Sequence, residues 1–180
     1  MPEQPPLDEA VLARRRAALA RVLQWGEPAL RVRAREVDRF DDDLRREVAA
    51  MTALVEDALG AGLAATQLGV LHRVLVYRPE PEAPVRALVN PVVEWSSEES
   101  ELFGEGCLSL PGVWLDVERP SAVRVRAHDE HGAEVVVEAA GLEASVVQHE
   151  VDHLDGILIL DRATREQRRD AIRTLREALA

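Results

Sequence analysis

QHEVDHLDG occupies residues 148–156, within a segment, residues 142–154, whose apolar side chains recur at helical spacing. The first six residues contain the pattern HExxH. On a helix, positions four apart share a face, so His149 and His153 can bind one metal ion while Glu150 lies beside the water that the metal carries. Two unrelated histidines on a polar helix face are the alternative. The motif predicts a metal-dependent hydrolase if a third ligand exists.

The residues downstream of the motif offer poor third ligands. One group of enzymes continues the pattern as HExxHxxGxxH; Gly156 fits the glycine position, but Ile159 stands where the last histidine belongs. Another group uses a later glutamate. Glu166 and Glu177 are the candidates, and both lie among arginines, where ion pairing is the expected role. A downstream glutamate is therefore the weaker choice.

Cys107 is the upstream candidate, in the segment GEGCLSLP of residues 104–111. A glycine beside it lets the backbone approach a ligand closely. One thiolate and two imidazoles form a three-ligand site whose fourth position stays open for water, as catalytic sites require. A buried, inert thiol is equally consistent with these residues. As the only cysteine, Cys107 cannot form an intrachain disulfide, which agrees with a reducing compartment.

Length and composition predict a single domain. The chain has 180 residues, of which 47% are hydrophobic, enough for one core. A net charge of -11 argues against a protein whose whole surface binds nucleic acid, because affinity for phosphates comes from cationic side chains, so any nucleic-acid contact must be local. We expect no direct, sequence-specific binding of nucleic acid. The acidic amino terminus does not resemble a targeting peptide, and no run approaches the ~20 apolar residues of a membrane span. We expect a cytoplasmic protein with no membrane contact.

Periodicity and turn residues predict an α+β fold. Short-stranded mixed or antiparallel sheets are expected to pack around a central helix that bears the motif. We expect helices at residues 8–24, 41–58, 142–154 and 162–179, and strands at residues 73–77, 85–89, 122–127, 134–138 and 157–160.

Three segments resemble peptide deformylases. GAGLAATQLG at residues 60–69 is similar to their GxGLAAxQ element, residues 105–109 to EGCLS, and residues 148–156 to QHExDHLxG. The resemblance covers residues 22–161, which we interpret as the catalytic domain. Residues 1–21 are interpreted as an N-terminal helical extension, and residues 162–180 as a C-terminal helix of the same domain.

The resemblance implies hydrolysis of the N-terminal formyl group of formylmethionyl nascent polypeptides, with release of formate. It assigns the metal to Cys107, His149 and His153. Glu150 would be the general acid and base, and the Gln67 side chain and the Leu108 backbone N–H would donate to the formyl oxygen. It also implies one divalent metal ion, Fe(II) in the cell, with zinc, nickel or cobalt in purified protein.

The substrate pocket is predicted from spacing and from the resemblance. Leu142 and Val146 precede His149 by seven and three residues, so they can line a pocket for the methionine side chain or form ordinary core. The resemblance implies that Gly62 and Gly106 offer backbone hydrogen bonds to an extended peptide.

Two positions differ from the family pattern. Ala61 stands where a larger aliphatic residue is common, which would enlarge the pocket. Trp114 stands where some bacterial members have an arginine near the peptide, which puts that peptide contact in doubt.

Supporting contacts and partners are also predicted. A metal-bound histidine usually donates its second N–H to an acceptor, for which we consider Glu105, shared with Arg119, or else Asp152. The arginine-rich terminal helix resembles one that docks on the ribosome, although ion pairs within the helix would also explain it.

Two rival functions stay open. The first is another metal-dependent amidase or peptidase, with Glu177 rather than Cys107 as the third ligand. The second is a non-catalytic metal-binding or ribosome-associated module.

Overall fold

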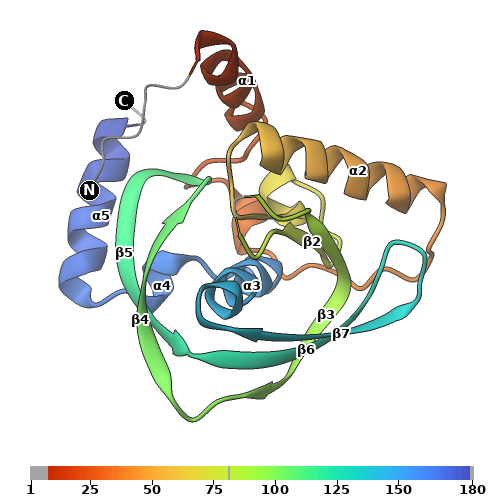
Figure 1. Ribbon diagram of the computed structural model, residues 1–180. Helices are drawn as coiled ribbons and strands as arrows, with labels where there is room; N and C mark the ends of the chain where they lie inside the picture. Colours follow the sequence, from red (N-terminus) through yellow and green to blue (C-terminus); the bar gives the residue numbers. More distant parts are fainter. Residues whose placement is uncertain (1–7, 81, 179–180) are drawn as a thin grey trace.

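A helix carrying the HExxH motif lies at the centre of the molecule, enclosed by two curved antiparallel sheets (Figure 1). The computed structural model describes residues 8–80 and 82–178. The predicted α+β class with a central motif-bearing helix is confirmed. Residues 1–7 of the expected extension and residues 179–180 of the expected terminal helix lie outside the described residues.

The described helices and 3-10 turns are α1 (Glu9–Leu19), η1 (Pro28–Arg31), α2 (Asp42–Asp57), η2 (Ala65–Leu68), α3 (Gly141–Leu154), α4 (Ile159–Arg162) and α5 (Arg165–Ala178). The larger sheet has the order β1-β2-β3-β6-β7, formed by β1 (Gly62–Ala64), β2 (Val74–Tyr77), β3 (Arg86–Ser96), β6 (Ala122–His128) and β7 (Glu134–Ala140). The smaller sheet is the hairpin of β4 (Ser100–Cys107) and β5 (Leu110–Pro120). No described helix is long and apolar enough to cross a membrane.

Helix α2 begins where its sequence supplies a cap. The Asp41 side chain accepts hydrogen bonds from the backbone N–H groups of Asp43 and Leu44, at 3.1 and 3.2 Å, which satisfies donors that a helix start leaves free. The apolar positions that follow at helical spacing are buried. The helix predicted over residues 41–58 is therefore confirmed.

Strand β2 contributes to two separate clusters of buried hydrophobic residues, because the side chains of a strand alternate between its two faces. Val74 and Val76 pack with α2, whereas Leu75 and Tyr77 pack with α3 and the strands β3, β6 and β7. A third cluster joins β5 to α4 and α5. The motif helix is thus held against the larger sheet by a fully buried apolar layer.

The prediction of a strand at residues 157–160 is wrong. Ile159 begins the short helix α4, and the Asp161 carboxylate accepts a hydrogen bond from the Leu158 N–H at 2.9 Å. Leu158, Ile159 and Leu160 are all buried. A short apolar run that is buried on every side has no periodicity to separate helix from strand, which explains the error.

The hairpin of β4 and β5 was not predicted. β4 contains two glycines, and because glycine has a low strand propensity the sequence of this segment did not indicate a strand. β5 does carry a signal, because buried Val113, Leu115 and Val117 alternate with exposed residues. The other strands lie where they were expected, apart from the three-residue β1, which was also not predicted, and with β3 longer than expected.

Candidate metal centre

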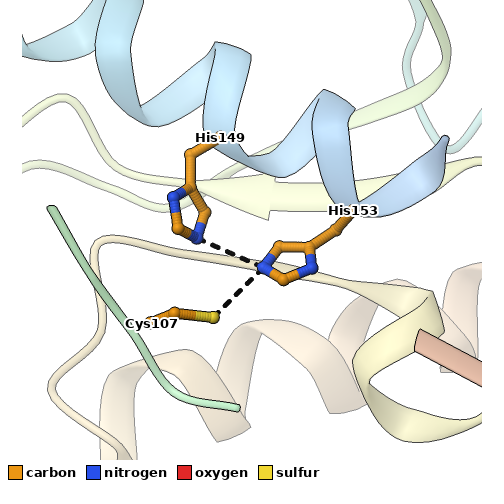
Figure 2. A group of neighbouring side chains, drawn as sticks. All are labelled: Cys107, His149 and His153. Atoms are coloured by element: carbon orange, nitrogen blue, oxygen red, sulfur yellow. Dashed lines mark hydrogen bonds between the residues drawn. The ribbon is translucent and has the colours of Figure 1, made fainter. Parts of the chain in front are cut away.

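Cys107, His149 and His153 converge on one point between α3 and the end of β4 (Figure 2). The two histidines are four residues apart on α3, so both rings leave the same helix face. His153 Nε2 lies 3.2 Å from Cys107 Sγ and 3.2 Å from His149 Nε2. All three candidate ligand atoms lie within 4.8 Å of one another. The sequence-predicted ligand set is brought together in space.

An irregularity in the hairpin places the thiol. Gly106 pairs with Trp114, but the next residue, Cys107, pairs with Leu110, so the register shifts between the two positions. Such a shift bends the strand and changes the direction of its side chains. Leu108 lies in the tight turn that follows, and its carbonyl accepts a hydrogen bond from Gln24 Nε2 at 3.3 Å. The turn therefore has a fixed position beside the ligands.

Glu105 orients the first histidine. Its Oε2 lies 2.9 Å from His149 Nδ1, and its Oε1 accepts a hydrogen bond from Ser145 Oγ at 2.9 Å. When His149 is neutral and its Nδ1 donates to this carboxylate, its lone pair is on Nε2, which faces Cys107 and His153. The predicted contact between Glu105 and a candidate ligand histidine is confirmed.

Arg119 holds the Glu105 carboxylate in place. Its Nε and Nη2 both donate to the Glu105 carboxylate, the latter at 2.9 Å, and its Nη1 donates to Asp152 Oδ2 at 2.9 Å. Burial raises the pKa of Glu105, but Arg119 and His149 outweigh it and bring the pKa down to about 2. Glu105 is therefore an anion at neutral pH.

Among the described residues, Asp152 forms no hydrogen bond with His149 or His153. It accepts hydrogen bonds from Arg119 and from both Nε and Nη2 of Arg162, at 2.9 and 2.5 Å. Asp152 therefore links the network of Glu105 to α4. Of the two acceptors considered from sequence, Glu105 is the one in contact with His149.

Glu150 is a buried carboxyl next to the ligands on α3, only 4% exposed. Its Oε2 has no hydrogen-bond partner among the described residues. Burial raises the pKa of Glu150 to about 7. A carboxyl that is balanced between its two protonation states near neutral pH suits proton transfer.

Gly62 leaves the space that Glu150 occupies. A Cβ added to Gly62 would lie 2.5 Å from Glu150 Oε1 and 2.7 Å from its Cγ. No side chain fits there without displacing the carboxyl. Gly62, in the GAGLAATQLG segment, must therefore be a glycine because the Glu150 side chain of the HExxH motif occupies the adjacent space.

Gln67 presents its amide nitrogen to the site. Its Oε1 accepts a hydrogen bond from the Ala64 N–H at 2.9 Å, which leaves Nε2 directed at Ser109 Oγ, 3.1 Å away, and at Cys107 Sγ, 3.7 Å away. The side chain is 1% exposed. Gln67 is therefore a fixed donor beside the ligands.

Burial also affects the second histidine. It lowers the pKa of His153 well below its ordinary value. A neutral imidazole is the form that binds a metal. The Nδ1 of His153 is buried and has no hydrogen-bond partner among the described residues.

The expected substrate residues lie in different surroundings. Val146 is partly buried against the cluster around α3, whereas Leu142 and Trp114 are 60% and 71% exposed. Ala61 is exposed at the start of the buried segment Gly62–Ala64. Glu166 and Glu177, the alternative ligands, are exposed on α5.

Sequence reasoning missed two serines of the site. Ser145 supports Glu105 and is buried, and Ser109 accepts from Gln67. Ser145 lies four residues before His149, so helical spacing would have placed it beside the ring. Ser109 is within the EGCLS segment but carries no spacing signal.

Comparison with known proteins gives a consistent result. The sequence model of the polypeptide deformylase family matches residues 19–169. A peptide deformylase of Parafrankia sp. (strain EAN1pec) is 45% identical over 153 residues, covering 85% of this chain and 83% of that protein. One of Treponema pallidum (strain Nichols) is 44% identical over 148 residues, covering 82% and 90%.

Solved structures agree. The crystal structure of a peptide deformylase from Legionella pneumophila has a TM-score of 0.83 and 35% identity, covering 87% of this chain and 92% of that one. A peptide deformylase from Synechococcus elongatus in complex with actinonin has a TM-score of 0.79 and 37% identity, covering 96% and 89%.

Proposed function

The chain belongs to the polypeptide deformylase family, metal-dependent hydrolases that remove the N-terminal formyl group from nascent peptides, and we propose that Cys107, His149 and His153 hold its metal ion. The enzyme accordingly releases formate from formylmethionyl polypeptides.

The convergence of the three side chains is the observation that carries the metal assignment. Ligand bonds of roughly 2.0–2.3 Å to one ion require donor atoms about as close as those of Cys107, His149 and His153. His149 is already oriented by Glu105, and the His153 imidazole is neutral. The donor set therefore fits one ion with a position left open.

We further propose Fe(II) as the ion in the cell, and zinc, nickel or cobalt as replacements in purified protein. A mixed thiolate and imidazole set accepts any of these ions, so supply and oxidation decide which is present. Metal analysis of protein isolated under anaerobic conditions tests the proposal: zinc as the main metal, with full activity, would contradict it.

Glu150 is proposed as the proton carrier. When bound, the metal ion acts as a Lewis acid that activates a water molecule and polarises the formyl carbonyl. Glu150 takes a proton from the attacking water and returns it to the leaving amine, for which its pKa near 7 is suited. Because the Glu150 side chain is buried, bulk water is excluded from this proton transfer.

Gln67 and the Leu108 N–H are proposed to stabilise the oxygen of the formyl group as it gains charge. Gln67 Nε2 is preorganised by the bond from Ala64 to its Oε1. Removing one such donor typically costs about 10²–10³ in turnover.

The peptide is proposed to bind extended beside β4, with hydrogen bonds to the backbones of Gly106 and Gly62. Leu142 and Val146, on the helix face of the ligands, then line the pocket for the methionine side chain. Ala61 leaves more room at the pocket entrance than a larger aliphatic residue would.

Formate release tests the assignment directly. The metal-loaded enzyme is expected to release formate from formyl-Met-Ala-Ser, and Glu150→Gln to reduce the rate by about 10² or more with unchanged metal content. Cys107→Ser is expected to lose metal and activity together. Full metal binding and activity in Cys107→Ser would favour the rival amidase with another third ligand.

The helix α5 is proposed as a ribosome contact. Among ion pairs of the described residues, only that of Arg173 with Asp170 involves an α5 arginine, so most of its positive charge faces outward. Such a surface suits ribosomal RNA. Because Leu175 and Ala171 are buried, deletion of the helix would also expose core, and charge reversal is the better test. Co-sedimentation with ribosomes that is unchanged in Arg169→Glu/Arg176→Glu would remove the proposal.

We also propose a cytoplasmic location, where formylated chains are made.

A further inference from the structure

Trp114 is the most exposed large aromatic side chain near the metal centre. It is 71% exposed, although it lies in β5 directly opposite Gly106 of β4. A large apolar ring left in water next to a binding site costs free energy that a ligand can recover.

The indole lies over two glycines of β4. A Cβ on Gly104 would be 2.6 Å from Trp114 Nε1, and a Cβ on Gly106 would be 2.9 Å from its Cε3 and Cζ3. The ring therefore extends along β4, with its six-membered part at Gly106 and its nitrogen at Gly104. Any side chain at Gly104 would force the ring away from this position.

This places the ring on the opposite face of β4 from the catalytic helix. Glu105 points to α3, where it contacts His149. Because neighbouring residues of a strand point to opposite faces, Gly104 and Gly106 face the other way, and the indole covers that face. Gly106, over which the ring lies, directly precedes Cys107 in β4.

We propose that Trp114 is a specificity-determining residue that contacts the side chain directly after formylmethionine and favours large apolar side chains there. The proposal rests on the extended binding mode given above. In an extended peptide beside β4, the methionine side chain points to α3, and the next side chain therefore points to the face covered by the indole. An aromatic or large aliphatic residue at that position packs on the exposed ring.

The test compares peptides that differ only in the second residue. Formate release is measured from formyl-Met-Phe-Ser, formyl-Met-Leu-Ser and formyl-Met-Ala-Ser with the metal-loaded enzyme. We expect a higher kcat/KM for the phenylalanine and leucine peptides than for the alanine peptide. In Trp114→Ala the ratio of phenylalanine to alanine peptide should fall by about 2- to 10-fold, the range expected for one aromatic contact. The change should lie mainly in KM, since the contact is remote from the reacting bond.

Two further variants separate this role from a general effect. Gly104→Ala should lower the same ratio because its Cβ displaces the ring, and it should have no additional effect in the Trp114→Ala background. Trp95→Ala is the matched control, because Trp95 is 52% exposed on β3, and it should leave the ratio unchanged.

An unchanged ratio of phenylalanine to alanine peptide in an active Trp114→Ala enzyme, or an equal change in Trp95→Ala, would overturn the proposed role of Trp114 and leave the proposed site intact. Absence of formate release from all three peptides would instead overturn the proposed site, so the two failures are distinguishable.

Discussion

Glu105 Oε2 lies 2.9 Å from His149 Nδ1, and this single contact determines which ring nitrogen of the histidine faces the other two ligands. The carboxylate is in turn held by Arg119 and Ser145. A ligand whose partner is itself fixed loses little freedom on binding a metal, which raises affinity.

Glu105→Gln should weaken metal binding by about 10- to 100-fold, the range for loss of such a partner. Glutamine keeps the shape of the Glu105 side chain but lacks the negative charge that favours a proton on His149 Nδ1. Competition with a chromophoric chelator measures the affinity. Glu138→Gln, which alters an exposed ion pair with Arg124, is the control and should leave metal affinity unchanged.

Ser145→Ala keeps the Glu105 charge and should weaken metal binding by less than about tenfold. A larger loss in Ser145→Ala than in Glu105→Gln would contradict this account.

Gly62→Ala should reduce kcat/KM by about 10² or more while metal content stays the same. The added Cβ would meet the Glu150 carboxyl at 2.5 Å, so the carboxyl must move away from its position beside the ligands. Formate release and metal analysis on the same preparation measure both quantities. In the Glu150→Gln background the substitution should cost little more, because its effect passes through Glu150. Additive losses would indicate another cause.

Much of the fold and site followed from patterns that have a local physical origin. The helical spacing of His149 and His153 identified the motif helix, and Asp41 identified the start of α2. The distant Cys107 followed from its motif. The contact of Glu105 with His149 was among the alternatives, although distance along the chain gives no means to choose between Glu105 and Asp152.

Other features depend on tertiary structure and left weak signals. The path of β4 past its two glycines depends on pairing with β5, and the helical form of α4 depends on burial of all its apolar residues. The position of Trp114 over Gly104 combines residues ten apart in sequence, and only the pairing of the hairpin reveals it.

Gly156→Ala should destabilise the fold by about 3 kcal/mol, because it combines a left-handed backbone with a collision. Gly156 has φ +74°, and its Cβ would lie 2.7 Å from the Arg31 carbonyl oxygen. Gly141 is the matched control: its φ is +57°, but no atom lies within 4 Å of the added Cβ. Gly141→Ala should therefore cost only about 1 kcal/mol. Urea denaturation at neutral pH measures both, and equal costs would show that the contact with Arg31 relaxes freely.

Asp161→Asn should lower stability at neutral pH, and the difference from the parent chain should disappear in acid. Partial burial raises the pKa of Asp161, but the hydrogen bond from the Leu158 N–H and the Arg31 guanidinium outweigh it, so the pKa lies below its usual 3.8. The folded state therefore favours the carboxylate. This stabilisation is fully present well above pH 3.8, the value for the unfolded chain, and is lost as the pH falls through the lower pKa of the folded chain.

Urea unfolding at several pH values between 3 and 6 measures the difference. Asparagine still accepts the Leu158 N–H, so the comparison isolates the charge. In the Arg31→Gln background the effect of Asp161→Asn should be smaller, because the two charges interact directly. A stability difference that stays constant down to pH 3 would contradict this account, because a difference that comes from the Asp161 charge must shrink as the carboxylate is protonated.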